Sequence, residues 1–252
     1  MNQSITKSGF LTLVLSTIVL GIALSGCNSV PEDWGTPNPD YLVLIEASSC
    51  WNKICPGLTT PEEARQHLQL LPFGEEIEIE DSDPENSLVL FLDNQRFEGS
   101  WVSVKFDSLG ESVQSVRIVL GKNEMTMEQV VDVVGEPRQV IATANGNGDS
   151  AASFVSYKMW YPELGLSVSS GFYNAGRNPM PSQIILHPTL STTEFEYMGV
   201  EEGKEQLLEY LMIGLAPYQR PEDKQELEIF FHPWLGFDNS VSSFLDYERF
   251  RP

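Results

Sequence analysis

Two closely spaced cysteines, Cys50 and Cys55, are the side chains whose chemistry is easiest to infer from type and spacing. Four residues separate them in the sequence. In an oxidising compartment such a pair forms a local disulfide. The spacing differs from the C-x-x-C of thiol oxidoreductases, and a metal site would need further ligands. We therefore expect a structural disulfide, with two free thiols or a redox-active pair as the alternatives.

An acidic stretch over residues 75–86 is the densest cluster of metal-ligand types. Asp81, Asp83 and Glu85 alternate as the acids of calcium loops do, but the stretch lacks the glycine at the sixth position and the distal bidentate glutamate. In its first half isoleucine alternates with glutamate, which is typical of a strand with one solvated face. We expect an edge strand and a loop here, with weak calcium binding as the alternative.

Catalytic and metal-binding motifs are absent from the sequence. His67, His187 and His232 are far apart and lack the His-x-x-x-His spacing of zinc sites. The segment Gly165–Ser169 lacks the second glycine of the Gly-x-Ser-x-Gly nucleophile turn, and no phosphate-binding loop occurs. We expect no catalytic residue, no metal, no cofactor and no enzymatic activity. The alternative is an extracytoplasmic hydrolase or small-ligand-binding protein with no recognisable motif.

Charge and composition narrow the function classes further. The 252 residues include 15 Lys and Arg against 36 Asp and Glu, a formal net charge of -21. So acidic a chain repels phosphate backbones and anionic lipid, and we expect no nucleic acid partner. With 41% hydrophobic residues the chain can bury a core, and its length allows one large domain or two small ones.

The N-terminus indicates where the protein is located. Lys7 is the only charged residue before Glu32, and the charge-free run Gly9–Leu24 follows it. The run is short for the roughly 30 Å of a bilayer's hydrocarbon core, and an uncleaved transmembrane helix is the alternative to a secretory signal. The segment Leu24-Ser25-Gly26-Cys27 resembles the lipobox of bacterial lipoproteins.

This resemblance implies a lipid anchor. Residues 1–26 are then a lipoprotein signal peptide, and the Cys27 thiol carries the lipid that attaches an extracytoplasmic protein to the cell membrane. Residues 27–40 are rich in Pro, Gly and Asn, so we expect a flexible tether between the anchor and the fold.

Two helices are expected where a threonine precedes an apolar run at helical spacing. Thr60 is the expected N-cap of the first helix, which ends before Pro72. Thr126 is the expected N-cap of the second, where Gln129 completes a capping box and Gly135 ends the helix.

Strand-like runs follow each helix, and their order predicts the fold class. Three follow the first helix and four the second: Ser87–Asp93, Ser100–Asp107, Ser112–Leu120, Arg138–Ala144, Phe154–Tyr161, Leu164–Gly171 and Gln183–His187. We expect an α+β fold of tandem units, each with one short helix packed on a three- to four-stranded antiparallel sheet, over residues 41–120 and 121–190. Residues 191–252 are expected to be a C-terminal extension or a degenerate third unit, with a helix over Glu201–Leu215 and a strand over Glu226–His232.

The second helix and its flanks carry a family resemblance. Gly121, Met125-Thr126, Glu128–Val130 and Val134–Pro137 resemble the G-M-T-x-x-Q-V-x-x-x-L-G-x-P helix of small bacterial envelope lipoproteins of the SmpA/OmlA type. The tandem repeats of beta-lactamase inhibitor protein have a similar helix. This chain departs from the pattern by three residues inserted after Gly121. The resemblance implies a non-catalytic module that binds a protein partner or assists envelope assembly.

Aromatic residues are the candidates for contact with such a partner. Trp160, Tyr173 and Trp234 are the candidate interface residues, because Tyr and Trp are frequent anchors at interfaces; the alternative is that they fill the core. Tyr157 and Trp160 lie three positions apart in one predicted strand, so their side chains point to opposite faces and we expect at least one on the surface. A helix packed on the sheet is expected to bury Trp101.

Overall fold

The computed structural model describes residues 39–80, 87–93, 95–121, 125–146, 152–175, 188, 191–200, 203–215, 227 and 230–237. All of them belong to the compact unit Thr36–Pro252. The predicted signal peptide, the Cys27 anchor, the loop after the acidic strand and the strand Gln183–His187 lie outside the described residues.

The described residues form an α+β fold with one 3-10 helix, three α-helices and nine strands. In chain order these are η1 (Pro39–Leu44), α2 (Pro61–Gln69), β1 (Gly74–Glu80), β2 (Ser87–Leu92), β3 (Trp101–Phe106), β4 (Val113–Val119), α3 (Met127–Val134), β5 (Gln139–Gly146), β6 (Ala152–Tyr161), β7 (Leu166–Ala175), β8 (Glu194–Tyr197), α4 (Gly203–Leu215) and β9 (Phe231–Pro233).

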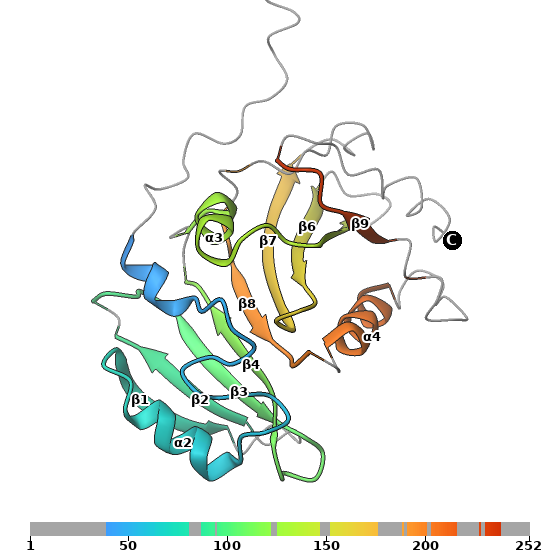
Figure 1. The fold of residues 1–252 in the computed structure, drawn as a ribbon. Helices are drawn as coiled ribbons and strands as arrows, with labels where there is room; N and C mark the ends of the chain where they lie inside the picture. Colours follow the sequence, from blue (N-terminus) through green and yellow to red (C-terminus); the bar gives the residue numbers. More distant parts are fainter. Residues whose placement is uncertain are drawn as a thin grey trace, which may run out of the picture. The chain divides into compact units, whose positions relative to one another are not determined.

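All nine strands join one antiparallel sheet in the order β1-β2-β3-β4-β8-β7-β6-β5-β9. Figure 1 shows β8 between β4 and β7. Val116 of β4 lies opposite Tyr197, and Val119 lies opposite Glu194. The segment after residue 190 therefore begins with a strand at the centre of this sheet.

Both predicted helix starts are confirmed. The Thr60 hydroxyl accepts a hydrogen bond from the Glu63 N–H, and the Glu63 carboxylate accepts one from the Thr60 N–H at 3.0 Å. Thr126 and Gln129 form the same reciprocal pair at the start of α3, with 2.9 Å between the Thr126 nitrogen and Gln129 Oε1. Each capping box satisfies two backbone groups that a helix start otherwise leaves unpaired.

One face of the sheet is apolar and forms the main core. In β3, Val102 and Val104 point to this face and are fully buried, as the alternation of the strand requires. Helix α3 covers this face: its Val130 is fully buried, and the Tyr161 hydroxyl donates a hydrogen bond to the Gly135 carbonyl at 3.1 Å. The helix-on-sheet packing expected around the second helix is therefore present.

The segment after η1 is tied to the centre of the same face. The Tyr197 hydroxyl donates to the Glu46 carbonyl and accepts from the Glu46 N–H, both at 3.0 Å. The Trp51 indole nitrogen donates to the Leu44 carbonyl at 3.0 Å, and the Trp51 ring is fully buried. Burial raises the pKa of Tyr197, so its hydroxyl keeps the proton that this contact uses.

Helix α4 covers the opposite face of the sheet over strands β5 and β6. Ile141 and Trp160 pack there against Leu207 and Leu208 of the helix. Gly203 begins α4 directly over the indole, where a Cβ atom would lie 2.6 Å from Cη2 of Trp160. The second half of the sheet is therefore covered on both faces.

Candidate functional site

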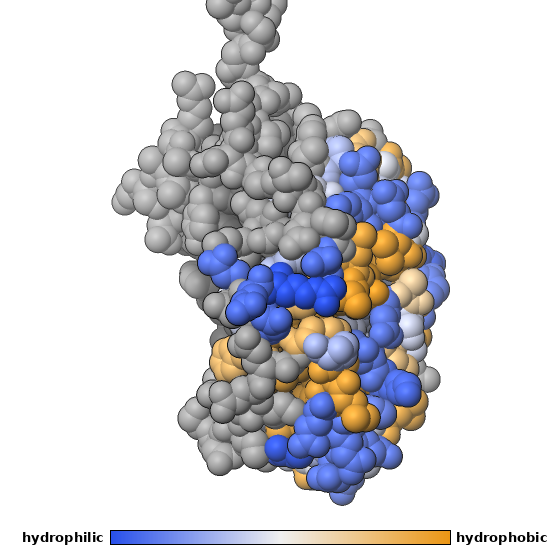
Figure 2. Space-filling model, turned by 90° about the vertical axis from the view of Figure 1, so that its left-hand side faces the viewer, coloured by the Kyte–Doolittle hydropathy of each residue, from blue (hydrophilic) through white to orange (hydrophobic). Residues whose placement is uncertain are grey.

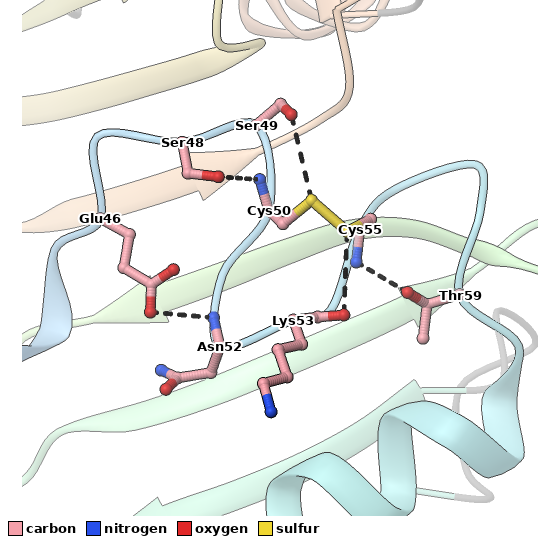
Figure 3. Close-up of a disulfide and its surroundings, with 8 residues drawn as sticks. All are labelled: Glu46, Ser48, Ser49, Cys50, Asn52, Lys53, Cys55 and Thr59. Atoms are coloured by element: carbon pink, nitrogen blue, oxygen red, sulfur yellow. Dashed lines mark hydrogen bonds between the residues drawn. A yellow bond between two sulfur atoms is a disulfide. The ribbon is translucent and has the colours of Figure 1, made fainter.

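The predicted disulfide between Cys50 and Cys55 is confirmed, and it cross-links the two arms of a tight hairpin (Figure 3). Trp51 and Ile54 exchange two backbone hydrogen bonds of 2.9 and 2.7 Å. Asn52 and Lys53 between them have positive φ angles of 45° and 68°, which is the signature of a type I′ turn. The cysteines are the next opposing pair, with 4.2 Å between their Cα atoms, close to the spacing of a non-hydrogen-bonded antiparallel pair.

Side chains around the disulfide fix the hairpin in place. Oε1 of Glu46 accepts from the Asn52 N–H at 3.2 Å, and Oγ1 of Thr59 accepts from the Cys55 N–H at 2.8 Å. Trp51 and Ile54 are fully buried, whereas Lys53 is exposed at the tip. The disulfide therefore holds two core side chains in position, which is a structural role.

The expectation that Trp160 or Tyr157 is exposed is wrong. Their side chains do point to opposite faces, but Trp160 is 2% exposed and Tyr157 is fully buried. The reason is that α3 lies on the face of Tyr157 and α4 on the face of Trp160. Trp160 is a core residue in this fold and not an interface residue.

The other two candidate interface residues have different outcomes. Trp234 follows β9, is half-buried, and contacts Phe237 edge to face with 4.9 Å between ring centroids. Its indole nitrogen is shielded from solvent and has no hydrogen-bond partner among the described residues. The backbone of Tyr173 lies in β7, but its side chain is outside the described structure.

A group of apolar side chains that the sequence interpretation missed lies on the half of the sheet that α4 does not cover. Phe91, Trp101 and Val119 lie directly opposite one another on β2, β3 and β4, on the face away from the main core. We call these three residues the open strip. Phe91 is 43% exposed and Trp101 is half-buried. Contrary to the expectation, no helix among the described residues covers Trp101. The alternation of β3 was the signal, because Trp101 and Val104 are three positions apart and face opposite sides.

Four charged residues meet on this face where the two halves of the sheet join. Glu194 pairs with Nη2 of Arg117 at 2.5 Å and lies 4.0 Å from Nζ of Lys158. Glu196 lies opposite Arg117 across β4 and β8. We call Arg117, Lys158, Glu194 and Glu196 the charged seam. Burial, partly offset by Lys158, raises the pKa of Glu196.

Two serines border the charged seam on β7. Ser167 lies opposite Glu196, and Ser169 lies opposite Lys158 and Glu194. Both hydroxyl oxygens are buried, and within the described parts of the chain neither forms a hydrogen bond. The contacts recorded beside these serines are the ion pairs of Glu194 with Arg117 and Lys158, which link β4, β6 and β8.

Metal-binding groups do not come together in the parts of the chain that the structure describes: no three His, Cys, Asp or Glu side chains are placed to hold an ion. His67 lies on α2 and His232 on β9, while His187 is outside the described residues.

None of the described helices combines the length and the hydropathy that crossing a bilayer requires. On the face drawn in Figure 2, hydrophobic residues of the described part lie in small groups among hydrophilic ones.

Comparison with known proteins identifies no relative of this chain. No family model, no curated protein and no solved structure matches the chain. The resemblance of the second helix to SmpA/OmlA-type lipoproteins therefore stays a prediction.

Proposed function

We propose that this chain is a lipid-anchored, extracytoplasmic lipoprotein that acts as a non-catalytic protein-binding or envelope-assembly module. The open strip carries the proposal. It presents Phe91 and Trp101 side by side, whereas Trp51 and Trp160 are buried in the core. Aromatic side chains that lie together on an exposed sheet face are typical anchors for a protein partner.

The order of the strands supports a tandem design. Helix α2 precedes β1–β4 and helix α3 precedes β5–β8, and each set of four strands is adjacent in the sheet. The last strands of the two sets, β4 and β8, pair with each other in antiparallel orientation. Two copies of a helix-and-four-strand unit related by a two-fold axis would meet in this way.

The two proposed units differ in what covers them. Helix α4 packs over Trp160 in the second unit, on the same face that carries the open strip in the first. Within the described residues no helix packs on the open strip. In the described part of the first unit, Phe91 is exposed and Trp101 half-buried, so a partner can contact the open strip.

The N-terminal sequence supports the proposed location. Residues 1–26 would be removed as a signal peptide, Cys27 would carry the lipid, and residues 27–40 would link the anchor to the fold. The membrane contact is then the anchor itself, because a chain with a net charge of -21 is repelled by anionic lipid.

Co-purification from native membranes in mild detergent tests the proposal. The tagged wild-type chain is compared with Phe91→Ser and Trp101→Ser, with Cys27→Ser as the unanchored control. Leu70→Ser is the matched surface control, because Leu70 is 79% exposed at the end of α2. We expect a stoichiometric partner that the two open-strip variants lose and Leu70→Ser keeps. A partner retained by both open-strip variants, or no partner from anchored wild type, would refute the proposal.

A further inference from the structure

Two leucines at one end of the sheet are almost fully exposed. Leu58 is 81% exposed in the segment before α2, and Leu109 is 78% exposed in the turn between β3 and β4. The two segments are joined by backbone hydrogen bonds: Gly57 donates to the Val113 carbonyl at 2.7 Å, and Val113 donates to the Thr59 carbonyl at 2.8 Å. Figure 1 shows both segments at this end of β3 and β4. The segments that carry the two leucines therefore lie at the same end of the sheet.

The turn that carries Leu109 is held rigidly by one carboxylate. Asp107 accepts hydrogen bonds from the N–H groups of Leu109 and Glu111, both at 3.0 Å. It also accepts from the Ser112 N–H at 2.9 Å and from the Ser112 hydroxyl at 2.7 Å. These hydrogen bonds lower the pKa of Asp107, and the bond from the Ser112 hydroxyl has the largest effect. Four bonds to one side chain leave the turn little freedom to lose on binding.

The segment that carries Leu58 is equally constrained. The Cys55 carbonyl accepts from the N–H groups of Leu58 at 3.1 Å and Thr59 at 3.0 Å, and Cys55 is fixed by the disulfide. Pro56 of this segment lies against Gly199, where a Cβ atom would be 3.5 Å from the proline Cβ. The next residue, Val200, is 52% exposed. We call Leu58, Leu109 and Val200 the loop-end surface.

Acidic groups border the loop-end surface. The segments 55–59 and 107–112 contain Asp107 and Glu111 and no Lys or Arg. The Glu63 carboxylate is held at Thr60, directly after the first segment, and hydrogen bonds from Thr60 lower its pKa. Asp107 and Glu63 therefore stay ionised at neutral pH. An acidic border disfavours an anionic bilayer and a second copy of this acidic chain, and favours a cationic partner.

We propose that the loop-end surface docks a protein segment whose apolar residues are flanked by Lys or Arg. The apolar side chains would cover Leu58 and Leu109, and the cations would lie beside Asp107 and Glu111. Prior ordering of both turns reduces the entropy lost on binding. This contact is separate from the open strip, because Trp101 begins β3 and Asp107 follows its end, a strand length of about 17 Å at 3.3 Å per residue.

A pair of synthetic peptides tests the proposal directly. Both have the same leucines, and one has Lys where the other has Glu at the remaining positions. Each is titrated into the full chain in zwitterionic nanodiscs, with empty nanodiscs as the blank, and binding is followed by fluorescence anisotropy. We expect the Lys peptide to bind at least about tenfold more tightly than the Glu peptide.

Substitutions that keep the net charge separate specific docking from general attraction. The double variant Leu58→Ser/Leu109→Ser is expected to lose at least about tenfold in affinity for the Lys peptide. Leu70→Ser, a leucine of matched exposure at the C-terminal end of α2, and the open-strip variant Phe91→Ser are expected to bind as wild type does. Failure of the proposed open-strip interaction would therefore leave this result unchanged.

Four outcomes would overturn the proposal. Equal affinity of the double variant and wild type would show that net charge alone attracts the peptide. An equal loss in Leu70→Ser would show that any exposed leucine serves. Self-association that the double variant abolishes in sedimentation would assign the surface to a second copy. Broadening of the Leu58 and Leu109 methyl signals by a nitroxide-labelled lipid would assign it to the bilayer.

Discussion

The hairpin closed by Cys50 and Cys55 gives a quantitative test of the fold. Replacing both cysteines by alanine removes the constraint and keeps the backbone sequence of the turn. The disulfide spans a sequence separation of 5. For so short a loop the chain-entropy relation gives a loss of about 2 kcal/mol in the free energy of unfolding. For a domain of this size that loss lowers Tm by about 4–8 °C.

The turn inside the loop allows a matched rescue. Lys53 has a φ angle of 68°, a conformation that disfavours side chains with a Cβ atom, and type I′ turns prefer Asn-Gly at these positions. Asn52 already supplies the first residue. Lys53→Gly in the cysteine-free background is therefore expected to recover about 1 kcal/mol, because it relieves the left-handed conformation of an exposed residue.

Urea denaturation of the full chain, followed by tryptophan fluorescence, measures both changes. Reduction of the wild type must give the same free energy of unfolding as the double alanine variant, with an unchanged denaturant slope. The reasoning fails if the double variant is as stable as wild type, or if Lys53→Gly destabilises it further. The first result would mean that core packing and not loop closure holds the hairpin around Trp51 and Ile54, and the second that the left-handed conformation of Lys53 carries no strain.

Four other substitutions test separate parts of the fold. Trp160→Ala is expected to lower the free energy of unfolding by about 3–5 kcal/mol in urea titrations, because the indole is buried under Gly203. Thr126→Ala removes one half of the capping box of α3 and is expected to lower Tm by the equivalent of about 1 kcal/mol, measured by circular dichroism. Burial raises the pKa of Glu196, so the folded chain holds this proton more tightly than the unfolded chain and stability falls as pH rises through the raised pKa. Glu196→Gln is therefore expected to stabilise the protein at neutral pH, and the gain disappears below the pKa of an ordinary glutamate; Glu194→Gln, which removes a partner of Arg117, is expected to destabilise it in the same urea titrations.

Local chemistry in the sequence was sufficient for the helix starts and most of the strands. Thr60 and Thr126 act through residues three positions away, so a short window contains the whole interaction. The strand Glu194–Tyr197 was missed because it has only four residues, too few for alternation to stand out. Its importance comes from pairing with β4 and β7, which no local pattern records.

Burial of the aromatic residues required information from distant parts of the chain. The alternation of side chains along the strand correctly placed Tyr157 and Trp160 on opposite faces. Helix α4, which covers the face of Trp160, begins more than forty residues later in the chain. Trp101 shows the converse. Its position in β3 was predictable, yet only the sheet order shows that no described helix reaches that half of the face.

The charged seam explains why two halves can join through so short a strand. The sequence of β8, Glu194-Phe195-Glu196-Tyr197, alternates strictly, with Phe195 and Tyr197 fully buried on the apolar face. A slip of one residue would turn both glutamates into the core and both aromatic rings onto the face of Arg117 and Lys158. The ion pairs of Glu194 contribute little net stability, because burying charges offsets their attraction. Their effect is on register, since every shifted pairing leaves buried charges without partners, and the register of β8 fixes how the open strip and the α4-covered half lie in one sheet.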